Sequence, residues 1–468
     1  MKLTFYGAAR QVTGSNYLLE ATNYKQQTTK ILIDCGLHQG PRYCEDENFK
    51  PFPYDPKEIE AVFVTHAHID HIGRLPQLYR QGFRGAVYST APTKDFAEQL
   101  LLDSEHILAK EAGDRNKPPI YTIEDVNNVL GLWHKRKYHE PVAHGPFTVE
   151  FYDAGHILGS SFIVVEENVV SPKSPNGDRA SKRVVFSGDV GNVKTPIVKD
   201  TEAIDAADYA IIESTYGGRI HENVESRRDH LEDAIEDVVK AGGTLMIPAF
   251  AMERTQDLLF ELNQLVEDHR IPRVPVFIDS PLAIKLTTVY KKYSADPLYV
   301  DEDALAHLRR GDAIFDFPGL TFALTTEQSK AINDVKGPKI VIAGSGMSNG
   351  GRILHHERRY LSDPKSTILF IGYQAQGTLG RRILDGAQTV TIFGEEIPVH
   401  CRKRAISGYS AHADQKKLIG WIRPMKLSLK KIFLVHGEED ESNSLAVKIR
   451  DELAIDAHIP HSGETVML

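Results

Sequence analysis

Three histidines and an aspartate stand within six residues of the chain, in the segment His66-Ala67-His68-Ile69-Asp70-His71. The apolar run 62–64 immediately before it has the composition of a buried strand, so the cluster follows a strand end. Two histidines at i and i+2 in an extended turn can converge on one metal ion, and the Asp-His pair can begin a helix and face a second ion. Nitrogen and carboxylate ligands suit Zn²⁺ with an open coordination position, as in catalytic sites. A solvated polar turn would account for one histidine but not for this cluster.

Further candidate ligands follow other strand-like runs. His156 follows the run 151–153, Asp189 follows the run 184–187, and Asp34 follows the run 31–33. Each of these turns is common by itself, because Asp-Gly and Gly-His turns form for backbone reasons alone. A carboxylate such as Asp189 could hold two metal ions about 3.5–4 Å apart, the separation used in two-metal hydrolysis. We expect Asp34 to orient a ligand or the nucleophile from beside the metals.

The elements that must position these residues belong to an α/β domain. Helical patterns cover 92–113 and 123–135, and strand-like runs cover 30–34, 61–65, 86–89, 147–153, 161–166, 183–187 and 208–213. This mixture predicts sheet packed against helices. The segment 171–182 is rich in Pro, Ser, Gly and charge, which predicts a surface hairpin tip.

The pattern changes after about residue 215. Helical patterns at 225–241, 253–267, 281–292 and 351–361 alternate with strand-like runs at 244–248, 274–279, 339–343 and 366–372. Such alternation predicts a mainly parallel, doubly wound sheet. Strands and histidine-bearing turns return after residue 389. We therefore interpret 215–390 as a domain inserted into a discontinuous domain formed by 1–214 and 391–468.

The motifs around Asp34, His66–His71, His156 and Asp189 resemble successive motifs of the metallo-β-lactamase superfamily. Three later segments resemble the additional motifs of its β-CASP nucleases, which include RNase J and the pre-mRNA cleavage endonuclease. They are 213–217 with Glu213, 407–414 with His412, and 433–438 with His436. The resemblance runs essentially end to end. It implies an αββα metallo-β-lactamase sandwich with an inserted doubly wound β-CASP domain.

The resemblance also implies two Zn²⁺ ions per chain and assigns their ligands. One ion would be held by His66, His68 and His156, the other by Asp70, His71 and His436, with Asp189 shared. His412 is expected to act as the general acid or to stabilise the leaving group, with Glu213 orienting it. Asp70 and Asp34 are counted with them among the catalytic residues. His412 could also belong to a capped helix start, since S-x-H-x-D is typical of one, and both roles can hold together.

What the resemblance implies about function is hydrolysis of phosphodiester bonds in single-stranded RNA by a metal-bound hydroxide. Endonuclease and 5′-exonuclease action both stay open. The expected phosphate contacts come from glycine-rich or strand-end positions of the second half: Ser345, Gly346, Arg254, Arg352, Ser407 and Ser410. Position 253 is glutamate where the group's pattern F-A-x-G-R has glycine, which affects the backbone and the charge near Arg254. Phe250 and Tyr373 could stack on bases, although core packing explains Phe250 equally well.

Bulk properties exclude several classes of protein. The formal charge of −9 over 468 residues argues against a protein that coats nucleic acid with a uniformly basic surface. Three cysteines, Cys35, Cys44 and Cys401, argue against a disulfide framework and favour the cytoplasm. The N-terminus has the pattern of strands rather than of a signal peptide, and no apolar run is long enough for a membrane span. Since the chain ends soon after the last motif, we expect a homodimer or a partner to contribute to RNA affinity.

Three other functions stay open beside the ribonuclease. The superfamily contains hydrolases of small esters and thioesters, but these do not need the inserted domain, His412 or His436. A DNA nuclease is a second alternative, because chemistry at the metals does not require a 2′-hydroxyl. A non-catalytic RNA-processing scaffold is the third, although such proteins usually lose metal ligands and here every expected position is filled. Metal content separates the scaffold from the enzyme.

Overall fold

The computed structural model describes residues 1–23, 26–40, 45–170, 179–221, 226–310, 313–372 and 374–468. Cys44, Tyr373 and most of the predicted hairpin tip at 171–182 lie outside the described residues, as do the side chains of residues 169–170, 179–180 and 407. Contacts divide the described chain into two units. The first contains 1–193, 200–220 and 412–468, and the second contains 194–199 and 221–411.

The first unit is built on two sheets of seven described strands each. From edge to edge, one sheet consists of β22 (Thr465–Met467), β1 (Lys2–Phe5), β2 (Tyr17–Thr22), β3 (Thr28–Ile33), β4 (Ala61–Phe63), β5 (Ala86–Thr90) and β6 (Trp133–Arg136). The other consists of β21 (Ala457–His458), β20 (Lys431–Val435), β11 (Tyr209–Glu213), β10 (Arg179–Phe186), β9 (Ser161–Val170), β8 (Phe147–Asp153) and β7 (Val142–His144).

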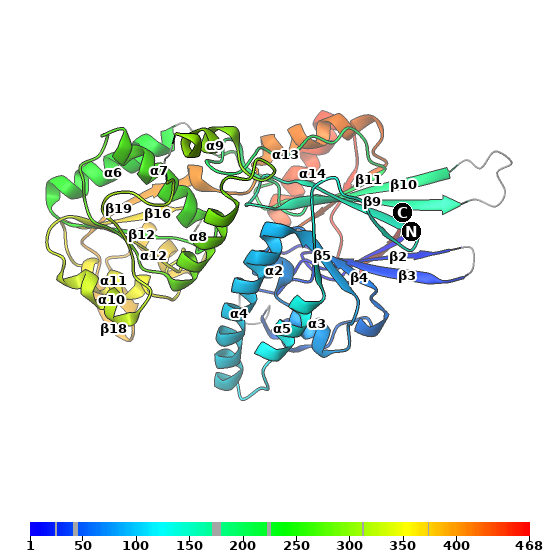
Figure 1. Cartoon of the computed structure of the whole chain (residues 1–468), viewed down its shortest axis with the longest axis horizontal. Helices are drawn as coiled ribbons and strands as arrows, with labels where there is room; N and C mark the ends of the chain where they lie inside the picture. The colour runs from blue at the N-terminus through cyan, green and yellow to red at the C-terminus, as the bar shows by residue number, and fades with distance from the viewer. Residues whose placement is uncertain (24–25, 41–44, 171–178, 222–225, 311–312, 373) are drawn as a thin grey trace. The chain divides into compact units, whose positions relative to one another are not determined.

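Aromatic side chains fill the space between these two sheets. Ring pairs cross from one sheet to the other, with centroids 5.3 Å apart for Phe5 and Phe433 and 6.2 Å apart for Phe63 and Phe151. Helices cover the outer faces (Figure 1): α3 (Leu75–Arg80), α4 (Ala91–Asp114) and α5 (Ile123–Gly131) lie on the side of the first sheet, and α13 (Gln415–Ile422) and α14 (Glu439–Leu453) pack on the second. The first unit is therefore the expected αββα sandwich.

The second unit has a sheet of six described strands whose pairings are all parallel. Its order is β14 (Leu320–Phe322), β13 (Val276–Ile278), β15 (Lys339–Ala343), β12 (Thr244–Pro248), β16 (Thr367–Ile371) and β19 (Arg402–Ile406). Its helices are α6 (Arg227–Ala241), α7 (Arg254–Glu267), α8 (Pro281–Tyr293), α9 (Glu302–Arg309), α10 (Thr326–Ala331), α11 (Ile353–Tyr360) and α12 (Leu379–Leu384), with a hairpin of β17 (Thr389–Ile392) and β18 (Glu395–Pro398). The doubly wound α/β prediction is confirmed. The domain boundaries expected at 214/215 and 390/391 stay a prediction.

The predicted helix over 123–135 is wrong in its last four residues. Helix α5 ends at Gly131, and Trp133–Arg136 form β6 instead. The buried Trp133 pairs with Val87 of β5, and its indole Nε1 donates a hydrogen bond to Ser89 Oγ at 2.8 Å. Pairing with a neighbouring strand therefore overrides the helical pattern, which sequence periodicity does not reveal.

The short helix α2 (Ile69–Ile72) depends on backbone contacts with two other loops. Four residues cannot hold a helix by themselves, because helix nucleation is unfavourable. Ser15 N and Cys35 N donate to the carbonyl oxygens of Asp70 and His71 at 2.9 and 2.8 Å. Gly36 allows this approach, since a Cβ at that position would lie 1.5 Å from Asp70 O.

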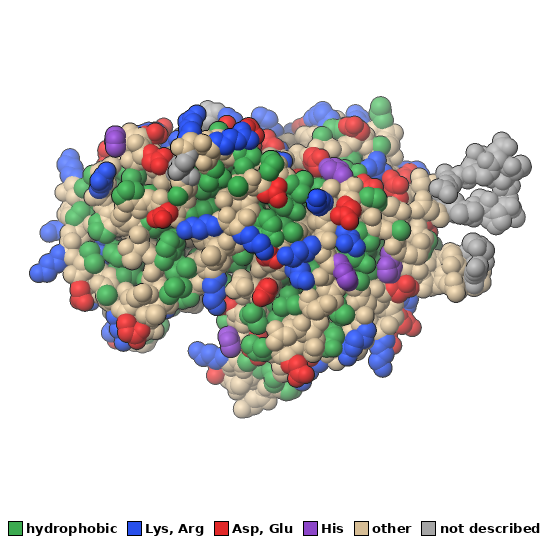
Figure 2. Space-filling model, viewed as in Figure 1, with side chains coloured by type: hydrophobic (Ala, Val, Ile, Leu, Met, Phe, Trp, Pro, Cys, Tyr) green, Lys and Arg blue, Asp and Glu red, His purple; other side chains and the backbone are tan. Residues whose placement is uncertain are grey.

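The surface agrees with the mixed composition. Figure 2 shows acidic and basic side chains interspersed over the face in view, rather than one continuous basic surface. Among the described residues, no helix combines the length and the apolar character needed to cross a membrane.

Gly36→Ala is expected to lower the free energy of unfolding by about 3 kcal/mol, because the added methyl group must displace the α2 backbone. Gly113→Ala, in open space on α4, is the matched control and should raise the free energy by up to about 1 kcal/mol through helix propensity. Denaturant unfolding of both variants measures this. Equal midpoints for Gly36→Ala and wild type would contradict the account of α2.

Candidate metal centre

Nine candidate residues of the first unit come together where its strands end. His66 and His68 follow β4, Asp70 and His71 lie on α2, and Glu213 ends β11. The remaining four follow β8, follow β10, precede α13 and follow β20, in that order: His156, Asp189, His412 and His436. Most of these side chains are buried, and buried charges or polar groups are costly unless they are paired or bind a metal.

The first candidate group consists of His66, His68, His156 and Asp189. His68 Nδ1 lies 3.0 Å from His66 Nε2 and 3.3 Å from His156 Nε2. Asp189 Oδ2 lies 3.3 Å from His66 Nε2. Ligand atoms at tetrahedral angles around Zn²⁺, with bonds of 2.0–2.1 Å, lie about 3.3 Å apart. The spacing within this group is that of a coordination shell.

The second candidate group consists of Asp70, His71 and His436. His436 Nε2 lies 3.1 Å from His71 Nε2 and 3.2 Å from Asp70 Oδ2. Two residues separated by 365 positions in the sequence thus present ring nitrogens to the same point. This group has the same ligand spacing as the first.

Asp189 reaches both groups with different oxygens. Its Oδ2 faces His66, and its Oδ1 lies 3.5 Å from His71 Nε2. The Oδ1 atom is buried and accepts no hydrogen bond from the described residues. A carboxylate with one oxygen in each group and an unsatisfied buried atom fits a pair of divalent cations that share it.

The electrostatics of the centre also fit bound cations. Burial lowers the pKa of His66, His68 and His156, so these imidazoles stay neutral, as metal ligands must be. Burial also lowers the pKa of His71, but Asp189 and Asp34 outweigh it and raise this pKa to about 10. The negative charge of these carboxylates thus stabilises a positive charge at the position of His71. A metal ion would supply that charge in place of a proton.

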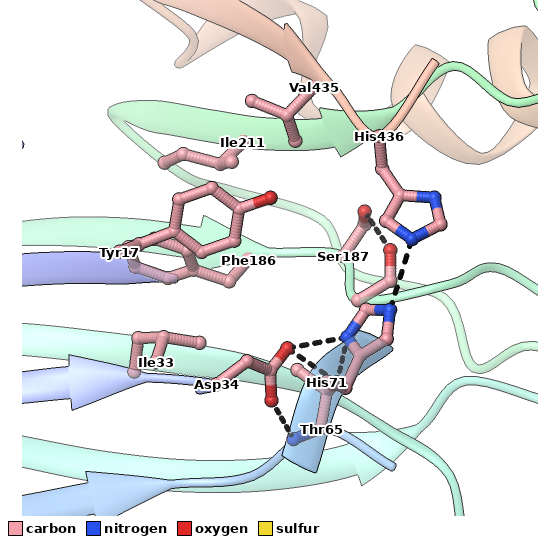
Figure 3. A pocket seen from close by; sticks show the side chains of 11 residues that line it. Tyr17, Ile33, Asp34, Thr65, His71, Phe186, Ser187, Ile211, Val435 and His436 are labelled. Atoms are coloured by element: carbon pink, nitrogen blue, oxygen red, sulfur yellow. Dashed lines mark hydrogen bonds and ion pairs between the residues drawn. The ribbon is translucent and has the colours of Figure 1, made fainter. Parts of the chain in front are cut away.

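Asp34 lies behind His71 and fixes the orientation of its ring (Figure 3). Its Oδ2 accepts a hydrogen bond from His71 Nδ1 at 2.8 Å, which leaves Nε2 facing the second group. Thr65 donates its backbone N–H and its hydroxyl to the two Asp34 oxygens, both at 2.8 Å. Such a carboxylate–histidine pair fixes the tautomer of a ligand and raises its basicity.

A cavity of about 10 Å³ lies beside Asp34 and His71, with room for about one water molecule. Figure 3 shows the Tyr17 ring among apolar neighbours, with its hydroxyl directed toward the side of Ser187 and His436. Burial raises the pKa of Tyr17 well above its usual range, so the phenol stays neutral. The cavity combines apolar walls with polar groups that an enclosed water could bridge.

Glu213 and His412 form a pair next to Asp189. Glu213 Oε2 lies 3.2 Å from His412 Nδ1, and Asp189 Oδ2 lies 3.9 Å from the same nitrogen. Glu213 is itself fixed, because its Oε1 accepts a hydrogen bond from Val190 N at 2.6 Å. Asp189, Glu213 and His412 also lie close enough to form a third candidate metal-binding group.

The six predicted phosphate-contacting residues all belong to the second unit. Ser345 Oγ accepts from Asn349 N at 3.0 Å, and Gly346 lies against the Phe250 ring, so the glycine-rich turn is closely packed. Arg352 donates to Asp279 Oδ1 at 2.7 Å and to two backbone carbonyls, and these bonds tie the turn to the ends of β13 and β14. Ser410 is buried, and the Ser407 side chain lies outside the described part of the chain. Their contact with phosphate stays a prediction.

Position 253 departs from the β-CASP pattern at a point where the backbone favours glycine. Glu253 has φ +68°, a left-handed conformation that is costly for a residue with a side chain. Its carboxylate forms an ion pair with Arg254, and both side chains are buried. Burial and the neighbouring Glu253 raise the pKa of Asp257 well above its usual range.

Phe250 is 44% exposed, so it is not a core residue.

Two residues at the centre were missed by sequence reasoning. Thr65 holds Asp34, and Thr215 Oγ1 donates to the His436 carbonyl at 2.9 Å and lies 3.3 Å from His436 Nδ1. Thr65 directly precedes His66, and Thr215 lies within the segment 213–217, two residues after Glu213. Adjacency was the only signal, and it does not distinguish an orienting hydroxyl from an ordinary turn residue.

The chain is expected to bind about two zinc ions, and Asp189→Asn is expected to bind fewer than one tightly. An amide has no charge and only one acceptor oxygen, so it cannot serve both groups. Metal analysis by mass spectrometry after dialysis against a zinc buffer measures this. Asp205→Asn, on the exposed surface, is the control and should keep both ions. Two ions in Asp189→Asn with unchanged affinity would contradict the shared role of Asp189.

Family models match three stretches of the chain. Residues 10–161 match the metallo-beta-lactamase superfamily, residues 255–383 match the Beta-Casp domain, and residues 396–460 match a Zn-dependent metallo-hydrolase RNA specificity domain. The stretches contain, in turn, the His66–His71 cluster, the glycine-rich turn of the second unit, and both His412 and His436.

Similar proteins extend these matches over nearly the whole chain. A Thermus thermophilus protein named as a ribonuclease is 38% identical over 442 residues, which cover 94% of each chain. Proteins named transcription termination factor FttA, from Methanosarcina mazei and Pyrococcus horikoshii, are 30% and 28% identical over 100% of this chain, which spans 72% and 71% of their lengths. The chain therefore belongs to the β-CASP group of the metallo-β-lactamase superfamily of metal-dependent hydrolases.

Proposed function

We propose that this protein is a zinc-dependent ribonuclease that hydrolyses phosphodiester bonds of single-stranded RNA. The observation that carries the proposal is Asp189, whose two oxygens face two separate His/Asp groups beside the Glu213–His412 pair. Two groups joined by one carboxylate are suited to phosphodiester hydrolysis. The ribonuclease name of the Thermus relative and the RNA specificity model support RNA as the substrate.

The proposed zinc ligands are the seven residues of the two groups: His66, His68, His156, Asp70, His71, His436 and the shared Asp189. Zinc bound there would make hydroxide available near neutral pH and offset negative charge on the phosphate. Burial lowers the pKa of His66, His68 and His156 and so keeps these imidazoles neutral, and the fold brings ring nitrogens of both groups together. Asp34 contributes through His71, whose Nδ1–H it accepts, and Thr65 keeps Asp34 in place.

His412 is the proposed proton donor to the leaving 3′-oxygen. Glu213, itself held by Val190 N, fixes one side of the His412 ring through Nδ1, so Nε2 is on the opposite side. The Glu213 carboxylate also stabilises positive charge on the ring, which favours a proton at Nε2. The His412 side chain is 20% exposed, whereas those of His71, His156 and His436 are almost completely buried, so His412 is accessible to a substrate. A leaving 3′-oxygen gives products with 5′-phosphate ends.

A role in transcription termination is the second candidate. The observation that favours it is the similarity, over 100% of this chain, to proteins named transcription termination factor FttA. Hydrolysis of nascent RNA would be compatible with both proposals. The buried thiols of Cys35 and Cys401 are both free, which fits the cytoplasmic location expected from the sequence. Formation of a homodimer stays a prediction.

His412→Ala is expected to lower kcat on single-stranded RNA by about 10²–10⁴-fold, the usual contribution of a general acid. Zinc content should stay at the wild-type value, because His412 is proposed to donate a proton rather than to bind metal. Single-turnover kinetics and metal analysis measure the two quantities. His230→Ala, on the exposed surface of α6, is the control. Loss of one zinc ion in His412→Ala would show instead that the group of Asp189, Glu213 and His412 binds metal.

The substrate and the mode of action are tested with 5′-labelled single-stranded RNA, with and without a 5′-monophosphate. We expect cleavage that chelation abolishes and Zn²⁺ restores, while single-stranded DNA of the same sequence stays intact. Mononucleotide release would assign exonuclease action, and discrete internal products would assign endonuclease action. Cleavage of the DNA without cleavage of the RNA would overturn the substrate, and a zinc-loaded protein inactive on both would favour a small ester or thioester substrate.

A further inference from the structure

The edge strand β6 carries a run of positive charge that the proposed chemistry does not use. His134, Lys135 and Arg136 belong to this strand, and Lys137 follows it directly. Lys135, Arg136 and Lys137 are three consecutive cations in a chain whose formal charge is −9. Among the described residues, β6 has a neighbouring strand on one side only, β5. The run therefore lies along an open edge of the sandwich.

Strand register places the end of this run level with the candidate metal centre. Tyr88 of β5 is paired with Phe63, so Thr90 is level with Thr65, the residue before His66. Thr90 is in turn paired with Arg136. Two strand spacings, or about 10 Å, therefore separate the Arg136 backbone from the turn that carries His66.

Hydrogen bonds fix this edge to the loop that carries His156. Thr90 Oγ1 donates to Gly159 O at 2.6 Å, and the Tyr138 hydroxyl donates to Ser160 O at 2.8 Å. Both acceptors lie within four residues of His156. The edge and the candidate metal centre thus belong to one continuous structure within the first unit.

An aromatic ring lies between the cationic side chains. Tyr88, His134 and Arg136 point to the same face of the sheet, because side chains alternate along a strand. The Arg136 guanidinium lies 5.1 Å from the centre of the Tyr88 ring, and the His134 ring lies 5.5 Å from it. His134 is exposed and Tyr88 half-buried. Flat rings beside cations can stack on bases while the charges contact phosphates.

Nearby carboxylates neutralise only part of the charge. Lys135 points to the other face and pairs with Asp95 at 2.6 Å. Arg136 Nε lies 4.0 Å from Glu140, which also accepts a hydrogen bond from Lys137 N. The face with Tyr88 thus has Arg136 and the His134 ring against one carboxylate, and the exposed Lys137 follows directly after the strand end. Lysines on an edge strand also prevent pairing with other strands, but that task needs no aromatic ring.

We propose that Tyr88, His134, Arg136 and Lys137, here named the β6 edge surface, bind single-stranded RNA next to the bond that is cleaved. The proposal rests on the ribonuclease function. Arg136 and Lys137 contact phosphates at the end nearer the metal centre, and His134 stacks on a base farther along the strand.

The test compares Arg136→Gln/Lys137→Gln with a control pair, Lys426→Gln/Lys448→Gln, which removes the same charge from other exposed positions. Affinity for a labelled phosphorothioate RNA 20-mer is measured over a range of salt concentrations, together with kcat on a 4-mer and on a 20-mer. At low salt we expect the first pair to bind the 20-mer about tenfold more weakly, with a log–log salt slope lower by about 1.4, since each single-strand phosphate contact contributes about 0.7.

Other variants separate the roles of the residues. Arg136→Lys/Lys137→Arg keeps both charges and should bind the 20-mer as tightly as the wild type does. His134→Ala should weaken binding about tenfold at an unchanged salt slope, because stacking releases no counterions. In these variants kcat on the 4-mer should fall less than the affinity for the 20-mer, because a shorter RNA reaches less of the β6 edge surface.

Equal affinity and salt slope in the glutamine pair and its control would overturn the proposal, even if the wild type cleaves RNA. Aggregation of the glutamine pair with unchanged affinity would identify the run as strand protection and would also overturn it. A wild type that binds the 20-mer through this edge without cleaving RNA would refute the ribonuclease and leave the binding surface intact.

Discussion

The structure of the centre depends on one buried carboxylate. Asp189 lies between the imidazoles of His66, His71 and His156, and its Oδ1 has no hydrogen-bond donor among the described residues. A buried charge of this kind destabilises a fold unless positive charge balances it. The imidazoles are held neutral or oriented by other groups, so they do not all supply that charge. Metal ions shared by Asp189 would satisfy both the carboxylate and the ring nitrogens, and they would then stabilise the fold as well as serve the proposed chemistry.

The sandwich brings residues that are distant in the sequence close to this carboxylate. His71 and His436 are 365 positions apart, yet their ring nitrogens are separated by 3.1 Å. The parallel pairing of β10, β11 and β20 brings Asp189, Glu213 and His436 to one edge of the second sheet, and His71 comes from α2, which follows β4 of the first sheet. The second unit is thus accommodated in a long connection between β11 and β20, which leaves the geometry of the centre to the first unit. The β6 edge surface belongs to the same unit.

Sequence patterns predicted the α/β class and most strands, because apolar periodicity and strand-end turns are local signals, whereas the sandwich was implied by the family resemblance. Ligand chemistry pointed to the His66–His71 cluster, His156 and Asp189, and the resemblance added Glu213, His412 and His436. Thr65 and Thr215 were not predicted, because a hydroxyl that orients a ligand has no pattern of its own. The β6 strand was missed because its pairing with β5 is decided by tertiary contacts. At Glu253 the sequence showed the departure from the family, but only the backbone angle shows that a glycine conformation is kept.

Anomalous diffraction at the zinc absorption edge, from crystals of the zinc-loaded protein, tests the central claim most directly. The account predicts two peaks about 3.5–4 Å apart, with one Asp189 oxygen bound to each and Asp34 bound to neither. A single peak, or two peaks with Asp189 on only one of them, would contradict it.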